Sequence, residues 1–195
     1  MKKRIFLFLA THLICLAIFA QQNIGLSLGA LRTSVETTQE PYNPNLLVVA
    51  NPLLRGQVGV YKNFVLKGRF SLQTHISYEL KGFKKLSNPA LETYTPVNMH
   101  YISLFPKLRY KVNDFIFGFG PKASFLLYVP NYNNYKKIEF ALTGEVGYSF
   151  NKFSCLLNYN YALTPYTSRV FLGGNVDYKS RYLALLFEIP LKIGK

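Results

Sequence analysis

The sequence predicts an all-β fold, an eight-stranded antiparallel up-and-down transmembrane β-barrel with short periplasmic turns and long extracellular loops. Three observations predict this fold. After an apolar leader, the chain alternates between apolar and polar residues with a period of two over eight segments. Tight turns and long loops alternate between these segments. After the leader, no apolar run approaches the roughly 20 residues that a membrane-spanning helix needs.

The leader has the three parts of a secretory signal peptide. Residues 2–4 are basic, residues 5–20 are almost entirely apolar, and Ala20 places a small residue before a cleavage site. The apolar stretch is too short for a typical spanning helix. We therefore expect residues 1–20 to be a signal peptide and residues 21–195 to be a β-barrel domain exported to the cell outer membrane.

Each strand is predicted from the alternation itself, because successive side chains of a strand point to opposite faces. Within residues 70–81, for example, Phe70 and Leu72 share one face, whereas Gln73 and His75 share the other. The eight predicted strands are residues 23–32, 55–66, 70–81, 98–112, 115–128, 138–150, 153–163 and 181–193.

The lengths of the connections between the strands distinguish the two ends of the predicted barrel, with short turns at one end and long loops at the other. Residues suited to tight turns stand at Lys67-Gly68, Asn113-Asp114 and Asn151-Lys152, with Lys62-Asn63 as a rival position for the first turn. Long loops are expected at residues 33–54, 82–97, 129–137 and 164–180. The apolar residues 46–54 either extend the second strand above the membrane or form a docking patch, and the sequence leaves both readings open.

The alternation does not say which face points outward. In a membrane barrel the apolar face contacts lipid, whereas in a soluble exported, lipocalin-like carrier it lines a cavity for a lipophilic ligand. Small residues beside long charged ones, such as Gly118 and Gly120 beside Lys122, favour a packed polar interior. Aromatic residues near the strand ends suit a membrane–water interface. We favour the membrane barrel and keep the carrier as an alternative.

The polar face carries the candidate functional residues. If it points inward, they form a lumen charge network, and buried charges should pair because unpaired ones are costly. The predicted members are Arg55, His75, Glu79, Lys107, Arg109, Lys122, Glu139, Glu145 and Glu188, with Lys81 and Lys111 on the same face. The preferred interpretation is a largely closed lumen, because eight strands leave little room for water. The alternative is a narrow anion pore lined by surplus cations.

The composition argues against several other functions. The 195 residues include two cysteines and three histidines, which offer little for a metal or cofactor site. His100, Ser103 and Asp114 could form a catalytic triad on paper, but residues 100 and 103 point to opposite faces of one strand. We therefore expect no enzyme, no cofactor and no bound metal.

The charge balance points to a membrane partner. Lys and Arg number 23 against nine Asp and Glu, a formal net charge of +14. Because the chain is exported, this surplus suits outer-membrane lipid and lipopolysaccharide phosphate better than nucleic acid. The long loops could serve other envelope proteins.

Four stretches of the chain together resemble one known family. They are Phe70-Ser-Leu-Gln, Tyr101-Ile-Ser-Leu-Phe-Pro-Lys-Leu-Arg-Tyr-Lys, Phe117-Gly-Phe-Gly-Pro121 and Gly144-Glu-Val-Gly-Tyr-Ser-Phe-Asn-Lys-Phe153. Their order and spacing over about residues 55–193 resemble the PorT-like outer-membrane beta-barrel family of Bacteroidetes. The resemblance implies an eight-stranded outer-membrane barrel, places the first turn at Lys67-Gly68 and brings no catalytic residues. The chain departs from the family at its end, where Ile193-Gly194-Lys195 replaces the usual terminal aromatic residue.

Overall fold

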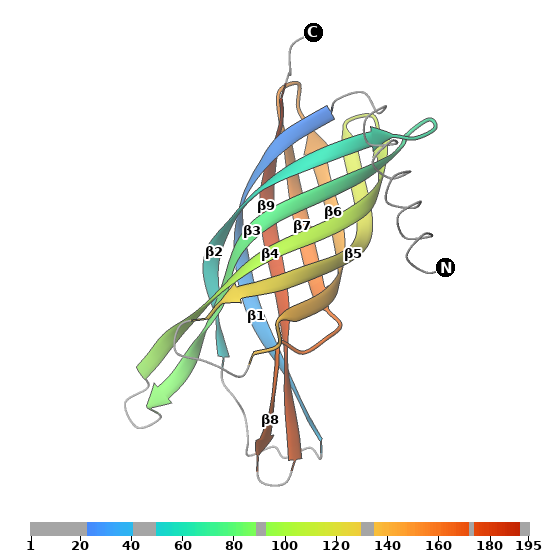
Figure 1. Cartoon of the computed structure of the whole chain (residues 1–195). Coiled ribbons are helices and arrows are strands. Elements are labelled where there is room, and N and C mark those ends of the chain that lie inside the picture. Colours follow the sequence, from blue (N-terminus) through green and yellow to red (C-terminus); the bar gives the residue numbers. More distant parts are fainter. Residues whose placement is uncertain (1–22, 41–49, 89–92, 130–134, 172–173, 192–195) are drawn as a thin grey trace, which may run out of the picture.

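The computed structural model describes residues 23–40, 50–88, 93–129, 135–171 and 174–191. The predicted signal peptide, residues 1–20, lies outside them. Among the described residues, nine strands form one antiparallel sheet (Figure 1). The strands are β1 (Asn23–Glu40), β2 (Ala50–Val65), β3 (Phe70–Asn88), β4 (Thr93–Val112), β5 (Phe115–Tyr128), β6 (Ile138–Ser149), β7 (Ser154–Ala162), β8 (Thr167–Phe171) and β9 (Gly174–Pro190).

Eight of these described strands close into a barrel, which confirms the predicted fold. Strands β1 to β7 pair in chain order, and β9 pairs with both β7 and β1. The β1–β9 register runs without a break from Gly25↔Pro190 to Glu40↔Asn175. Closure pairs the backbone groups between neighbouring strands, which a sheet needs in order to lie within lipid. Among the described parts of the chain, no helix is long and apolar enough to cross a membrane.

The short turns lie together at one end of the barrel, as predicted. Gly68 has a φ of +68° and Asn113 a φ of +53°, a left-handed conformation that glycine and asparagine tolerate. The amide of Leu66 donates to the carbonyl of Phe70 at 3.0 Å and closes the first turn. The rival position for that turn, Lys62-Asn63, is wrong because both residues lie inside β2. We take this end as periplasmic, following the plan of outer-membrane barrels.

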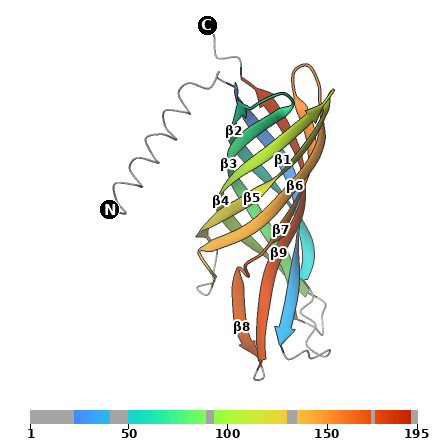
Figure 2. The ribbon, with the colours of Figure 1, turned by 90° about the vertical axis from the view of Figure 1, so that its right-hand side faces the viewer.

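At the opposite end the strands run further than the sequence predicted. β3 and β4 continue to Asn88 and from Thr93, so the expected loop at residues 82–97 is mostly a hairpin. Likewise, the expected loop at residues 164–180 contains β8, which pairs with the outer part of β9. Figure 2 shows this β8–β9 hairpin projecting beyond the barrel.

The apolar segment at residues 46–54 lies partly outside the described residues. Its described part, Ala50 to Leu54, belongs to β2, as one of the two interpretations expected. The pairing of β2 with β3 is interrupted between Pro52 and Gln57. This irregularity places the extension of β2 in a different register from the rest of the strand.

The apolar face of the sheet points outward. Ile76 is 50% exposed and Phe117 is 47% exposed, whereas Lys107 is completely buried. Along the barrel strands the charged side chains of the lumen are buried, together with some apolar ones such as Leu31, Leu156 and Leu186, whereas the exposed side chains of the wall are mostly Leu, Ile, Val, Phe and Tyr. This orientation is that of a membrane barrel. It is the reverse of the orientation that the carrier alternative requires.

Candidate functional site

The lumen contains two groups of ion pairs, one nearer each end of the barrel. The periplasmic cluster consists of Lys107, Arg109, Glu145 and Glu188, and the extracellular cluster consists of Glu79, Lys81, Lys122 and Glu139. Their side chains meet because they occupy inward positions on β3, β4, β5, β6 and β9, whose alternation points every second residue into the lumen.

Glu145 and Arg109 organise the periplasmic cluster. Glu145 accepts hydrogen bonds from both Lys107 Nζ and Arg109 Nε. The other two guanidinium nitrogens of Arg109 donate to the two carboxylate oxygens of Glu188 at 2.8 and 2.7 Å, a bidentate pair. Glu145 fits because its neighbour across the β5–β6 pair is Gly118, where a Cβ atom would lie 2.5 Å from Glu145 Oε1.

Glu79 and Glu139 organise the extracellular cluster. Lys122 Nζ lies 2.6 Å from Glu79 Oε1, and Lys81 Nζ lies 2.7 Å from Glu139 Oε1. Lys81 also lies 3.5 Å from Glu79 Oε2, so it joins the two pairs. The Ser180 hydroxyl donates to the remaining oxygen of Glu139 at 2.6 Å. The buried charges are therefore both paired and hydrogen-bonded, which is the condition under which burial is tolerated.

An uncharged layer separates the two clusters. The ring of Phe105 has Lys107 Nζ at 4.9 Å and Lys122 Nζ at 5.1 Å from its centroid, within the range of cation–π attraction. His75 packs on this ring with a centroid separation of 4.2 Å, and its Nε2 lies 2.6 Å from Ser27 Oγ. Within the described residues, each cluster combines two cations with two carboxylates, so each is formally neutral.

An apolar lid covers the extracellular cluster. It consists of the buried side chains of Phe83, Val97, Met99, Tyr101, Val129 and Tyr166. The ring of Tyr101 contacts the charges below it, with Lys81 Nζ 4.4 Å from its centroid. Tyr166, between β7 and β8, is completely buried. Burial raises its pKa well above the ordinary value, so the hydroxyl stays neutral in this apolar layer.

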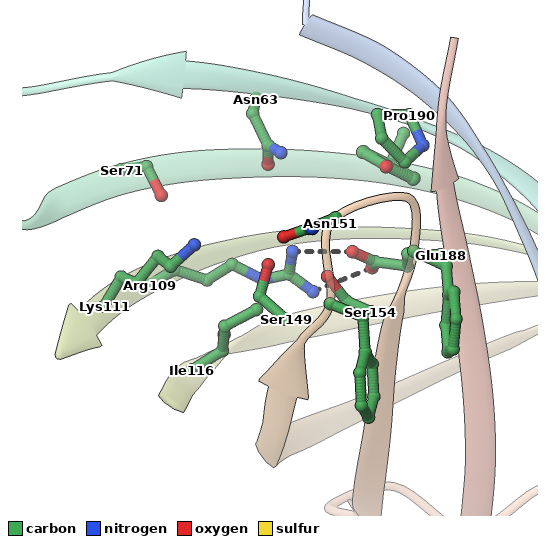
Figure 3. A pocket seen from close by; sticks show the side chains of 13 residues that line it. Asn63, Ser71, Arg109, Lys111, Ile116, Ser149, Asn151, Ser154, Glu188 and Pro190 are labelled. Carbon is green, nitrogen blue, oxygen red and sulfur yellow. Dashed lines mark hydrogen bonds and ion pairs between the residues drawn. The ribbon is translucent and has the colours of Figure 1, made fainter. Parts of the chain in front are cut away.

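A cavity of about 280 Å³ lies at the periplasmic end of the lumen. Ser71, Ser149 and Ser154 are among the residues that line it (Figure 3). Figure 3 also shows the paired Arg109 and Glu188 side chains beside this cavity, with Lys111 at one side. The cavity has a mixed lining, in which apolar residues such as Ile116 and Phe153 accompany the serines, and it reaches Arg109 and Glu188 of the periplasmic cluster.

The structure brings most of the predicted lumen residues together. Glu79, Lys107, Arg109, Lys122, Glu139, Glu145 and Glu188 all belong to one of the two clusters. His75 lies in the lumen, in the layer between the clusters. Arg55 is not part of either cluster. It is half-buried at the interruption of the β2–β3 pairing, where it donates to Asn98 Oδ1 at 3.0 and 2.8 Å. Lys111 is exposed at the periplasmic mouth.

Several uncharged residues of the site were not predicted. Gln73 donates to both oxygens of Glu188, Ser77 donates to Glu79, and the Tyr182 hydroxyl contacts Lys122. The alternation placed Gln73 and Ser77 on the same face as Glu79, but the predicted network contained only charged residues and His75. Phe105 also gave a signal, because it is an aromatic residue on the polar face next to Lys107.

The three residues that could have formed a catalytic triad, His100, Ser103 and Asp114, do not lie together. His100 is on the outer wall, where its Nδ1 is hydrogen-bonded to the Tyr78 hydroxyl. Ser103 points into the lumen and donates to Ser124 Oγ at 2.8 Å. Asp114 is in a periplasmic turn.

A closed barrel with an apolar outer wall and an ion-paired interior defines an outer-membrane β-barrel protein. Comparison with known families agrees. A family model described as an outer membrane protein beta-barrel domain matches residues 19–168, and the chain belongs to this family. Membership of this family supports a location in the outer membrane. No protein of curated function matches the sequence.

Comparison with solved structures finds several matches of low sequence identity. Neisserial surface protein A (NspA) is 11% identical, with coverage of 86% of this chain and 97% of that chain and a TM-score of 0.55. Ail, the attachment invasion locus protein of Yersinia pestis, solved with the heparin analogue sucrose octasulfate, is 10% identical over 87% and 99% of the two chains, with a TM-score of 0.41. The NanC porin is 13% identical over 85% and 100%, with a TM-score of 0.38. At these identities the likeness to NspA concerns the fold alone.

Proposed function

We propose that this protein is a small, non-conducting outer-membrane barrel that serves as a structural or binding protein through its extracellular end, and that it is not an enzyme. Its partners in this proposal are outer-membrane lipid, lipopolysaccharide and other envelope proteins. The β3–β4 and β8–β9 hairpins support a role for this end, because they continue past the barrel as paired strands (Figure 1).

The layered lumen is the observation that carries the proposal. An ion crossing the barrel would have to pass the periplasmic cluster, the layer of Phe105 and His75, the extracellular cluster and the apolar lid. The charges of the two clusters balance, so the clusters provide no surplus of cations for anions to follow through the middle of the barrel. An anion pore requires such a surplus together with a continuous aqueous path.

Planar-bilayer recording tests the proposal. The wild-type barrel should insert without producing discrete current steps. A variant with Phe105→Ala, Lys107→Ser and Glu145→Ser removes the central layer and one neutral pair of charges, and it should produce small leak currents that report successful insertion. Anion-selective steps from the wild-type protein would instead establish the pore alternative.

The proposal also includes the export of the chain by a signal peptide and its place in a subgroup of outer-membrane barrels. We propose that residues 1–20 are a signal peptide and that the chain is PorT-like, as its motif order suggests. Protein recovered from the outer-membrane fraction should then begin at Gln21, which N-terminal sequencing can establish. An N-terminus at Met1 on the inserted protein would contradict the signal peptide.

A further inference from the structure

A hollow of about 370 Å³ lies in the outer wall where β7, β9, β1 and β2 adjoin. Its lining includes Arg32 and Ser34 from β1, Tyr159 from β7, and Arg181 and Leu183 from β9. Tyr159 and Leu183 are 46% and 45% exposed, which places the hollow on the lipid-facing side. Two arginines on this otherwise apolar wall require an explanation, because charges facing hydrocarbon are destabilising.

The height of the two arginines on the barrel supplies part of that explanation. On β9, the outward residues between Pro190 and Arg181 are Ile189, Phe187, Leu185 and Leu183. On β1, the outward residues before Arg32 are Ile24, Leu26, Leu28 and Ala30. Counted from the periplasmic end of the barrel, each arginine is therefore the first outward-facing charge of its strand. It follows about the 9–11 residues that a β-strand needs to cross the hydrocarbon. Nearby, Tyr159 and Tyr161 are aromatic residues of the kind that mark a membrane interface.

The two guanidinium groups can reach one ligand. Arg32 is paired in register with Leu183, so Arg181 is its diagonal neighbour on the adjacent strand. Diagonal neighbours in a sheet lie about 7–8 Å apart, a span that two long side chains easily bridge. An arginine pair of this kind suits phosphate, because the planar guanidinium can donate two hydrogen bonds to one phosphate group.

Both arginines keep unused donors. Arg181 forms an ion pair with Glu36 through Nη2, and its guanidinium carbon lies 4.7 Å from the centroid of the Tyr161 ring. Its Nε is buried and has no hydrogen-bond partner. Arg32 is exposed and has no ion-pair partner among the described residues. Glu36, by contrast, competes with any anion for Arg181.

We propose that this hollow binds a phosphate group of an outer-leaflet lipid, with lipopolysaccharide as the source. Arg32 and Arg181 donate to the phosphate oxygens, while an acyl chain lies along Leu183 and Leu185 toward the membrane centre. The proposal rests on the proposed function for its orientation, with the long hairpins outside the cell. It adds a defined site and ligand chemistry to the outer wall.

Native mass spectrometry of the full-length mature barrel in detergent tests this site, with bisphosphorylated lipid A and dephosphorylated lipid A as the two probes. The wild-type protein should retain the phosphorylated probe at least about tenfold better, the effect expected for charge-assisted hydrogen bonds. Arg32→Gln should lose most of this preference, and the double variant with Arg181→Gln should lose all of it. Lys137→Gln, an exposed cation between β5 and β6, is the matched control and should bind as the wild type does.

Glu36→Gln separates a binding role from a structural one. If Arg181 serves a phosphate, removal of its competitor should strengthen retention of the phosphorylated probe. If Arg181 only stabilises the barrel through Glu36, the same change should leave retention unaltered or lower. Equal retention of the two probes by the wild type, or an unchanged preference in folded Arg32→Gln, would overturn the proposal. The conductance of the barrel is independent of these arginines, so failure of this site and failure of the closed-lumen proposal are distinguishable.

Discussion

Lys107 and Lys122 are almost completely buried, and each of them contacts a carboxylate and an aromatic ring. Each ammonium contacts a glutamate, and each lies about 5 Å from the face of Phe105. Burial of an ion costs several kcal/mol even after relaxation, and a counter-ion offsets this cost only when the remaining hydrogen bonds are also made. The stability of the lumen should therefore depend on complete clusters rather than on single pairs.

Glu145→Gln tests this dependence at one residue. The change leaves Lys107 without its carboxylate and Arg109 with Glu188 alone. We expect a loss of about 3–5 kcal/mol in the free energy of unfolding, the range for an uncompensated buried charge. Urea titration of the folded barrel in lipid vesicles would measure it. Glu36→Gln, which removes a partly exposed ion pair, should cost less than about 1 kcal/mol. Equal losses in the two variants would contradict the buried-network account.

At the residue scale, sequence reasoning gives the face of a side chain but not its height in the barrel. Alternation placed Glu79, Lys107 and Glu145 correctly on the inward face. It also assigned Arg55 and Lys111 to that face, but one lies at an interruption of the pairing and the other at the periplasmic mouth. Height depends on the stagger between strands, which pairing across the sheet determines and which a single strand does not encode.

At the scale of elements, the two ends of the barrel differ in how well the sequence predicts them. The periplasmic turns carry local signals, because Gly68 and Asn113 adopt left-handed conformations that few residue types tolerate. The sequence signals for the extracellular hairpins are weaker. Beyond the lumen charges the inward face becomes apolar, at Phe83, Val97 and Met99, so the contrast between the two faces disappears. β8 has only five residues and pairs with a single strand, too little for a recognisable alternation.

The first turn offers a test of a purely local effect. A Cβ atom at Gly68 would meet no neighbour within 4 Å, so substitution there changes the backbone preference alone. Gly68→Val should lower the free energy of unfolding by about 1–2 kcal/mol, the cost of a left-handed conformation for a residue with a side chain. Asn113→Gly should be neutral or slightly stabilising, because glycine adopts this φ at least as easily. Urea titration of both variants decides the matter, and a neutral Gly68→Val would show that the turn can change its conformation.

At the scale of the whole molecule, the barrel inverts the arrangement of a soluble protein. Its outer wall is apolar, and its interior combines ion pairs and hydrogen bonds with clusters of buried apolar side chains. The inversion explains how a strongly cationic chain can occupy a membrane. Lumen charges are neutralised within the clusters, and the first outward charges of β1 and β9 occur where the apolar wall ends. Sequence alternation detects the two faces, but only the closed sheet shows which of them is inside.

The position of the hydrocarbon band gives a prediction that belongs to the whole barrel. Leu185 is 43% exposed on the outer wall of β9, between the periplasmic end and Arg181, whereas Leu54 is 66% exposed beside Arg32 at the upper limit of the apolar wall. In vesicles, Leu185→Arg should lower the free energy of unfolding by about 2–4 kcal/mol and Leu54→Arg by about 0–1 kcal/mol, because the cost of a charge depends on its depth in the bilayer. Both leucines face outward, so a barrel surrounded by water would tolerate the two changes equally. Equal small losses in vesicles would therefore contradict the membrane position inferred for the apolar wall, and a larger loss at Leu54 would place the hydrocarbon nearer the hairpins.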